Sequence, residues 1–262
     1  MHIAQKIQVY IEQSIQALGA HTAIPLDGFT LYLHATDADP AENLLLPRPN
    51  LPAGAALERA IAGALAACAE RGRQPHFSFL DLAAPQLAAA LAAAGLTCRE
   101  RQPVLVAPPA EAINLPPRPE LAIERLTHRS PLAAIRTNLD VNAQGFDPGA
   151  TPASDDDARQ FRQHLVASRA FTLREQGEPV AAGMYTAIHG GVTELTGIAT
   201  LAGFRRRGFA KYLTASMAQA ALKSSAELVF LIAATAESAY VYAQAGFAPC
   251  GERVSYQGGA GA

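Results

Sequence analysis

The sequence predicts an α+β protein with a mixed, mostly antiparallel central sheet flanked by helices, arranged as two related lobes. First, residues 171–201 alternate as strands at 171–176, 179–188 and 192–201, joined by glycine-containing turns, which is typical of an antiparallel meander. Second, a helical pattern at 208–225 precedes the almost wholly apolar segment LVFLIAA. Third, half of the 262 residues are hydrophobic, which is enough to fill two cores of ordinary size.

The first half of the chain has the element order of the second half. Residues 1–20 carry apolar side chains at helical spacing and predict a docking helix. An alanine-rich helix is expected at 55–72. A shift of 151 residues places 77–104 on 228–255, and both segments have the order strand, helix, small-Gly-apolar, strand. We therefore expect an internal duplication, with residues 1–110 forming the first lobe.

A proline-rich connector separates the lobes. The segment APPAEAINLPPRPE, residues 107–120, has five prolines and cannot form regular helix or a central strand. We take 111–120 as the linker and 121–256 as the second domain, with a disordered tail at 257–262. In the second domain a strand is expected at 121–127. A helix at 130–146 and a loop whose acidic end caps the next helix follow.

Composition and charge limit the classes of partner. Lys and Arg total 21 against 23 for Asp and Glu, so no nucleic-acid or anionic-membrane partner is expected. Cys68, Cys98 and Cys250 are far apart in the sequence and indicate neither a disulfide framework nor a zinc site, which favours the cytoplasm. No uninterrupted apolar run is long enough to span a bilayer, and residues 1–20 lack the apolar core of a signal peptide.

The segment ELTGIATLAGFRRRGFA, residues 194–210, combines a strand, a short loop and a helix start. The first turn of a helix has unpaired N–H groups and partial positive charge, so it suits an anion. Gly208 permits a close backbone approach, and the arginines at 205–207 have paired donors for phosphate oxygens. The alternative is that these arginines are solvated surface charges.

This segment resembles the acyl-CoA-binding motif of the GNAT N-acetyltransferase superfamily, and Arg205, Gly208 and Ala210 fill its defining positions. The resemblance extends over residues 119–256 and includes YAQAGF at 242–247, which is similar to a second family motif. It implies the acyl-CoA N-acyltransferase fold, in which the fourth and fifth strands separate. It also implies acetyl-CoA in that gap, pantetheine on the open edge of strand four and pyrophosphate in the arginine turn.

The resemblance assigns cofactor binding to one end of strand four and to the turn after it. The residues are Ile198, Ala199, Thr200, Arg205, Arg206, Arg207, Gly208, Phe209 and Ala210. Three positions depart from the family pattern: Ala202 replaces a frequent proline, Arg206 a frequent glycine and Thr235 a frequent asparagine. None of these changes removes a backbone donor, so we still expect acetyl-CoA as the cofactor and no metal.

Catalytic roles follow from thioester chemistry: a neutral amine attacks, an oxyanion needs a donor, and the thiolate leaves as a thiol. By resemblance Tyr242 is the acid that protonates the thiolate, and a packing role is the alternative. Glu194 is the expected base, against an exposed charge at a strand end. Backbone N–H groups near Ile198 to Thr200 are the expected oxyanion donors.

The expected function is acetyl transfer from acetyl-CoA to a primary amine of a small molecule, by direct attack in a ternary complex. An acyl-CoA-binding pseudoenzyme or sensor is the alternative, and an arginine patch for nucleic acid ranks last. The first lobe lacks the cofactor motif and is expected to be a degenerate copy. The resemblance implies that residues 138–157 and 188–193 form the acceptor pocket, where aspartates attract a cationic amine or cap a helix. The sequence leaves open whether the chain forms a homodimer.

Overall fold

The computed structural model describes residues 2–258 and divides into two compact units. Unit 1 runs up to Val104 and resumes at Cys250, whereas unit 2 is Leu105–Pro249. The expected boundaries differ from this division in two respects. Residues 105–120, expected to lie partly in the first lobe and partly in a linker, belong to unit 2. The last strand, expected in the second domain, belongs to unit 1 from Cys250 on.

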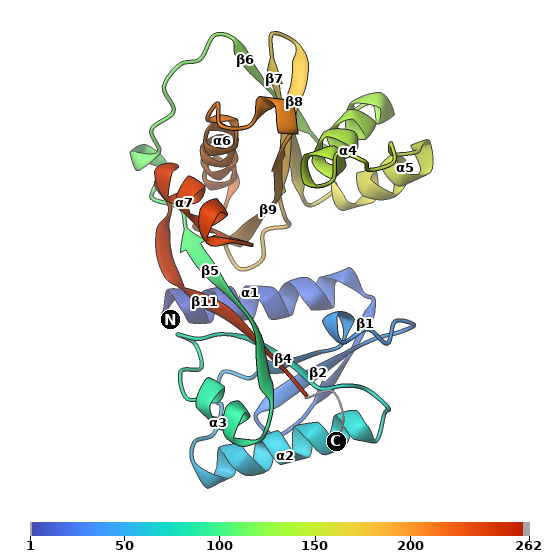
Figure 1. Ribbon diagram of the computed structural model, residues 1–262, viewed down its shortest axis with the longest axis vertical. Coiled ribbons are helices and arrows are strands. Elements are labelled where there is room, and N and C mark those ends of the chain that lie inside the picture. The colour runs from blue at the N-terminus through green and yellow to red at the C-terminus, as the bar shows by residue number, and fades with distance from the viewer. Residues whose placement is uncertain (1, 259–262) are drawn as a thin grey trace. The chain divides into compact units, whose positions relative to one another are not determined.

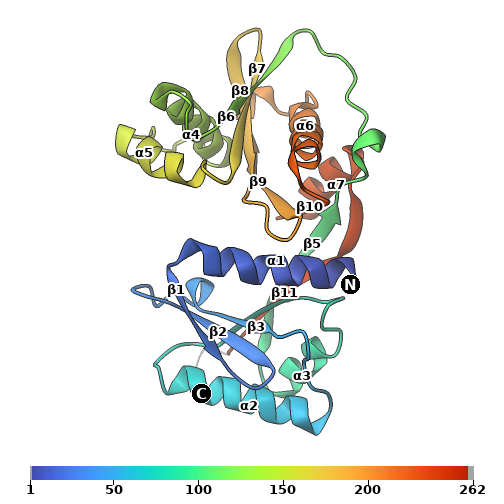
Figure 2. The ribbon, with the colours of Figure 1, turned by 180° about the vertical axis from the view of Figure 1, so that it is seen from behind.

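Unit 1 is a sheet with helices on both faces. Its elements are α1 (Ile3–Leu18), β1 (His21–Pro25), β2 (Phe29–His34), η1 (Pro40–Glu42), β3 (Leu44–Pro47), α2 (Ala55–Ala69), β4 (His76–Leu80), α3 (Leu87–Ala93), β5 (Thr97–Val106) and β11 (Ala248–Gln257). The last two residues of β5 and the first two of β11 lie in unit 2. The strand order is β1-β2-β3-β4-β11-β5. Figure 1 shows α1 on one face of the sheet and α2 with α3 on the other, and Figure 2 shows the same arrangement from behind.

The core of unit 1 follows from the apolar periodicity of its elements. In α2 the buried residues Leu57, Ile61, Ala64 and Cys68 recur at intervals of four, three and four, so one face of this helix is apolar. This face packs with aromatic side chains of the sheet in one cluster. The docking helix predicted at 1–20 forms as α1.

Strand β11 lies between β4 and β5 in the sheet. It pairs antiparallel with β4, from Arg253 opposite Leu80 to Gln257 opposite His76. An ion pair of 2.6 Å also joins Glu252 to Arg101 of β5. Gln257 is therefore part of a strand, although a disordered tail was predicted from this residue on. Residues 259–262 of that predicted tail lie outside the described residues.

Unit 2 contains the predicted meander and confirms the fold class. Its elements are η2 (Ala110–Ala112), β6 (Leu121–Leu126), α4 (Leu132–Phe146), α5 (Asp155–His164), β7 (Arg169–Glu175), β8 (Glu178–Tyr185), β9 (Val192–Thr200), η3 (Ala202–Phe204), α6 (Phe209–Ser224), β10 (Leu228–Ile232) and α7 (Ala236–Gln244). Strands β6 to β9 are antiparallel neighbours, and β10 joins β9 in parallel. Helix α6 covers one face, and α4 with α5 lies on the other (Figure 1).

Local sequence features determine the connections in unit 2. The β7–β8 turn has positive φ at Gln176 and Gly177, as a two-residue hairpin turn with right-handed strand twist requires. The predicted acidic cap of α5 is a capping box, in which Ser154 and Asp157 bond to each other's backbone N–H groups. Among residues 2–258, no helix has both the length and the apolar character needed to cross a membrane.

Candidate functional site

Strands β9 and β10 are paired only at their beginnings. The register pairs join Val192, Thr193 and Glu194 of β9 to the first three residues of β10. Strand β9 then continues to Thr200, but its described residues after Glu194 have no partner on β10. The β10-facing edge of residues 195–200 is therefore open, as the sequence resemblance implied.

A β-bulge lies in the middle of this open stretch. The β8–β9 register passes from Ala182 opposite Ala199 to Met184 opposite Thr196, so two residues of β9 face one of β8. One of the two, Gly197, has a φ of +61°, which glycine adopts without strain. The side-chain amide of Asn142 in α4 donates to the carbonyl oxygen of Gly197. Helix α4 thus holds the bulge in place.

The end of β9 leaves a backbone donor on the open edge. Leu201 donates its N–H to the carbonyl oxygen of Val180 at 3.0 Å, so this residue points toward β8. Successive residues of an antiparallel strand point alternately to the two sides. The N–H group of Thr200 therefore points away from β8, toward the gap. This donor lies within the segment 198–200 that the sequence predicted.

Helix α4 approaches β9 closely because a glycine lies at the contact. A Cβ atom on Gly145 would be 2.6 Å from the Ala199 Cβ and 3.2 Å from the Thr200 nitrogen. The Arg205 guanidinium reinforces this contact, since it donates to the carbonyl oxygens of Gly145 at 2.7 Å and Thr200 at 3.2 Å. Arg205 thus ties the end of α4 to the end of β9.

The turn after β9 ends in a helix start without a side-chain cap. Gly208 is the N-cap of α6 and has a φ of +79°. Within residues 2–258 the N–H groups of Phe209, Ala210 and Lys211 have no hydrogen-bond partner. An uncapped N-terminus of a sixteen-residue helix suits an anion, because its donors and its dipole point the same way.

The three arginines of the turn differ in their surroundings. Arg207 forms an ion pair of 2.5 Å with Glu175 and lies over the rings of Phe204 and Phe209. Arg205 is bonded to backbone as described above. Arg206 is exposed, has a φ of +62° and, in the described chain, makes no hydrogen bond or ion pair. Its left-handed backbone matches the position at which the family pattern often has glycine.

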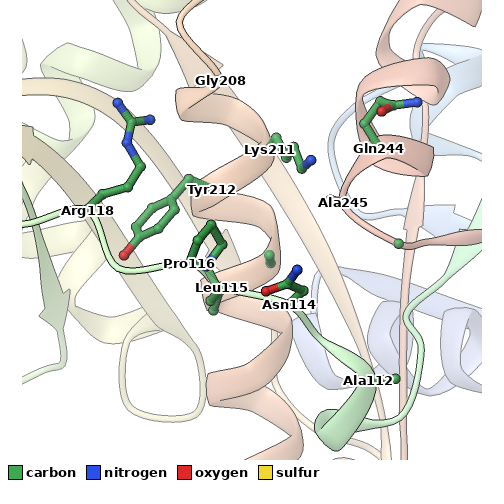
Figure 3. A pocket seen from close by; sticks show the side chains of 12 residues that line it. Ala112, Asn114, Leu115, Pro116, Arg118, Gly208, Lys211, Tyr212, Gln244 and Ala245 are labelled. Carbon is green, nitrogen blue, oxygen red and sulfur yellow. The ribbon is translucent and has the colours of Figure 1, made fainter.

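A pocket of about 370 Å³ adjoins the helix start (Figure 3). Its walls come from α6, the end of α7 and the proline-rich segment. The lining residues are Ala112, Asn114, Leu115, Pro116, Arg118, Gly208, Lys211, Tyr212, Ala215, Gln244, Ala245 and Gly246. The motif does not include Arg118 or Lys211. The sequence signal for Lys211 is its place one residue after the motif, whereas Arg118 lies in a proline-rich segment that also suits a connector.

The two predicted catalytic residues lie on different elements. Glu194 is half-buried and occupies the last register pair before β9 and β10 separate. Tyr242 is half-buried on α7 and packs against the core cluster of unit 2. Burial raises the pKa of Tyr242, so its phenol is protonated at neutral pH. Thr235 caps α7 by accepting from the Ser238 N–H at 3.1 Å, a role that asparagine also fills.

The aspartates of the expected acceptor loop all have partners in the protein. Asp140 accepts from the Ala153 N–H at 2.6 Å, and Asp147 accepts from the Gly149 N–H at 2.9 Å. The other three pair with arginines or form the α5 cap; they are Asp155, Asp156 and Asp157. These bonds favour the structural role over attraction of a cationic amine. No group of metal-binding side chains occurs within the described residues.

Separating parallel strands, a bulge on the open edge and a glycine-started helix define unit 2 as an acyl-CoA N-acyltransferase fold. Residues 139–247 match the model of the acetyltransferase (GNAT) family, so this part of the chain is a GNAT domain. No curated protein matches the sequence.

Solved structures share the fold over both units. A GCN5-related N-acetyltransferase from Kribbella flavida is 23% identical with a TM-score of 0.79, and the match covers 100% of this chain and 97% of that one. A tandem GNAT protein from the clavulanic acid biosynthesis pathway is 14% identical with a TM-score of 0.62, covering 89% and 79%. A GCN5-related N-acetyltransferase from Sphaerobacter thermophilus is 10% identical with a TM-score of 0.60, covering 88% and 80%. The tandem match agrees with the predicted two-lobe arrangement.

Proposed function

We propose that the protein transfers an acetyl group from acetyl-CoA to a primary amine of a small molecule, by direct attack in a ternary complex. The observation that carries this proposal is that the open edge of β9 leads, through the turn at residues 201–208, to an uncapped helix start. A strand edge offers donors and acceptors to an amide-containing chain, and the helix start offers donors to a phosphate. The three free cysteines are consistent with a reducing compartment, and we propose the cytoplasm.

The residues present fit this coenzyme. The open edge at 195–200 suits the amides of pantetheine, and the N–H groups at 209–211 suit the pyrophosphate. Arg206 is the arginine of the turn that is available to a phosphate, since Arg205 and Arg207 have partners in the protein. Acetyl-CoA supplies an acetyl group that is activated as a thioester.

The chain's own groups have three roles in this proposal. Glu194, at the mouth of the gap, accepts a proton from the acceptor amine. A backbone N–H group within Ile198 to Thr200 donates to the acetyl carbonyl oxygen as negative charge develops on it. Tyr242 donates its phenolic proton to the departing thiolate, and its raised pKa keeps that proton available at neutral pH.

Release of free CoA thiol tests the proposal. Acetyl-CoA is incubated with the full chain and a panel of primary amines, and thiol is measured against samples without amine. We expect at least one amine to increase thiol release well above the hydrolysis background. Tight acetyl-CoA binding with no response to any amine class would instead support the sensor alternative. Acetylation at an oxygen or sulfur in place of nitrogen would contradict the amine assignment.

A further inference from the structure

The pocket beside the arginine turn is lined mainly by residues from outside that turn. Three segments of unit 2 form it: the first turns of α6, the end of α7 and residues 112–118. None of its twelve lining residues is acidic, whereas two of them, Arg118 and Lys211, are basic. In Figure 3, Lys211 projects from α6 on the side of Gln244, and Asn114 lies between the two helices. The pocket is therefore suited to an anionic ligand.

The two basic residues differ in their contacts with the protein. Arg118 is held in place: its Nε donates to Glu120 at 2.7 Å and its Nη1 to the Arg207 carbonyl oxygen at 3.3 Å. Its guanidinium also lies 5.3 Å from the ring centre of Phe209. Lys211 is exposed and has no hydrogen bond or ion pair within residues 2–258. Lys211 is thus the cation that remains available to a ligand in the pocket.

The remaining lining suits a nucleoside. Leu115, Pro116 and Ala215 provide an apolar surface, and the side-chain amides of Asn114 and Gln244 provide donors and acceptors for the edge of a base. Gly208 lines both this pocket and the pyrophosphate turn, so one ligand can occupy both. A coenzyme whose pyrophosphate lies at the turn has its adenosine 3′-phosphate on the next segment of the molecule.

We propose that this pocket binds the 3′-phosphoadenosine end of the coenzyme, that Lys211 binds its 3′-phosphate, and that Arg118 holds residues 112–118 as the outer wall. The proline-rich segment between the lobes is then part of the coenzyme site. This inference rests on the proposed function. It adds a specificity: the protein distinguishes coenzyme A from 3′-dephospho-coenzyme A by one phosphate.

Calorimetric titration of the full chain with coenzyme A and with 3′-dephospho-coenzyme A tests this inference. We expect the wild type to bind coenzyme A about tenfold more tightly, as one charge-assisted contact supports. Lys211→Ala should remove that preference by weakening coenzyme A alone. Lys223→Ala, at the opposite, exposed end of the same helix, is the matched control and should keep the preference. Arg118→Ala should weaken both ligands to a similar degree, because the wall loosens.

Three outcomes would overturn the inference. The first is equal affinity of the wild type for both ligands, and the second is a preference that Lys211→Ala retains. The third is a loss of affinity in Lys211→Ala that is the same for coenzyme A and for 3′-dephospho-coenzyme A. These results leave the proposed function intact, since coenzyme A still binds. Failure of the wild type to bind either ligand would instead contradict the proposed function itself, and melting temperatures show that each variant is folded.

Discussion

Glu194 of β9 and Phe230 of β10 form the last register pair of the two parallel strands. Beyond this pair β9 has an open edge, and the helix that follows β10 carries Tyr242. The proposed base therefore lies where the gap begins, and the proposed acid comes from the next element after β10.

Tyr242→Phe tests the mechanism, because it removes one hydroxyl and retains the ring. We expect acetyl-CoA to bind as before while the single-turnover rate falls ~10²-fold, as for loss of a positioned general acid. The loss should extend over the neutral pH range, since burial raises the pKa of this phenol. The matched control is Tyr240→Phe on the same helix, where the side chain is 67% exposed. An unchanged rate in Tyr242→Phe would leave this tyrosine a packing role only.

The same tyrosine predicts a pH dependence of stability. Because its pKa is higher in the folded protein, the unfolded chain releases the phenolic proton first as pH rises. The wild type should therefore lose stability relative to Tyr242→Phe above about pH 10, the ordinary pKa of tyrosine. Denaturant unfolding of both proteins from neutral pH to above about pH 10 measures the difference between their free energies of unfolding. A difference that stays constant with pH would contradict the desolvation of Tyr242.

Gly145→Ala should destabilise unit 2. The added methyl would be 2.6 Å from the Ala199 Cβ, so α4 must move away from the β9 bulge. Overpacking of this kind costs about 1–3 kcal/mol in the free energy of unfolding. Gly63→Ala in α2 is the helical control, because its methyl meets no atom within 4 Å and alanine favours helix by roughly 0.5–1 kcal/mol. Chemical denaturation should show that Gly145→Ala lowers the free energy of unfolding and that Gly63→Ala raises it. Changes of the same sign would contradict the close contact.

Arg205→Ala and Arg206→Ala should separate stability from coenzyme binding. Arg205 bonds to carbonyl oxygens at the ends of α4 and β9, so its loss should lower the free energy of unfolding by ~1 kcal/mol. Arg206 makes no such bond in the described chain, so its loss should weaken acetyl-CoA binding and leave the melting temperature unchanged. The reverse pattern would show that Arg205 rather than Arg206 is the phosphate ligand.

Local patterns predicted the meander, α6 and the turn before α6, because periods of 2 and 3.6 and the glycines at turns are properties of short segments. The place of β11 was not predictable in this way. Its pairing with β4 joins residues more than 170 positions apart, and such a choice of strand edge leaves no mark in local periodicity. The role of residues 112–118 as a pocket wall was missed because five prolines also suit a free connector.

A motif proposes the site residues but does not predict their individual contacts. A motif gives Arg205, Arg206 and Arg207 equal weight, whereas neighbours from α4 and β7 decide which arginine is engaged in the protein. The inequality of the lobes was expected from the missing motif in the first half. Unit 1 adds a physical reason for this inequality. Leu80 is the repeat counterpart of Leu231 in β10, and its N–H donates to the Gln8 side chain of α1 at 2.9 Å, so this backbone donor is already engaged in the protein.

Calorimetric titration of acetyl-CoA into the wild type, Gly208→Asp and Gly95→Asp tests the central claim most directly. An aspartate at Gly208 places a side chain and a negative charge at the proposed pyrophosphate turn. Gly95 is exposed with a similar φ of +84° but lies in unit 1, so it controls for backbone strain and charge. The account predicts one equivalent of acetyl-CoA bound by the wild type and by Gly95→Asp, and none by Gly208→Asp. Wild-type affinity in folded Gly208→Asp, or a second equivalent bound, would contradict it.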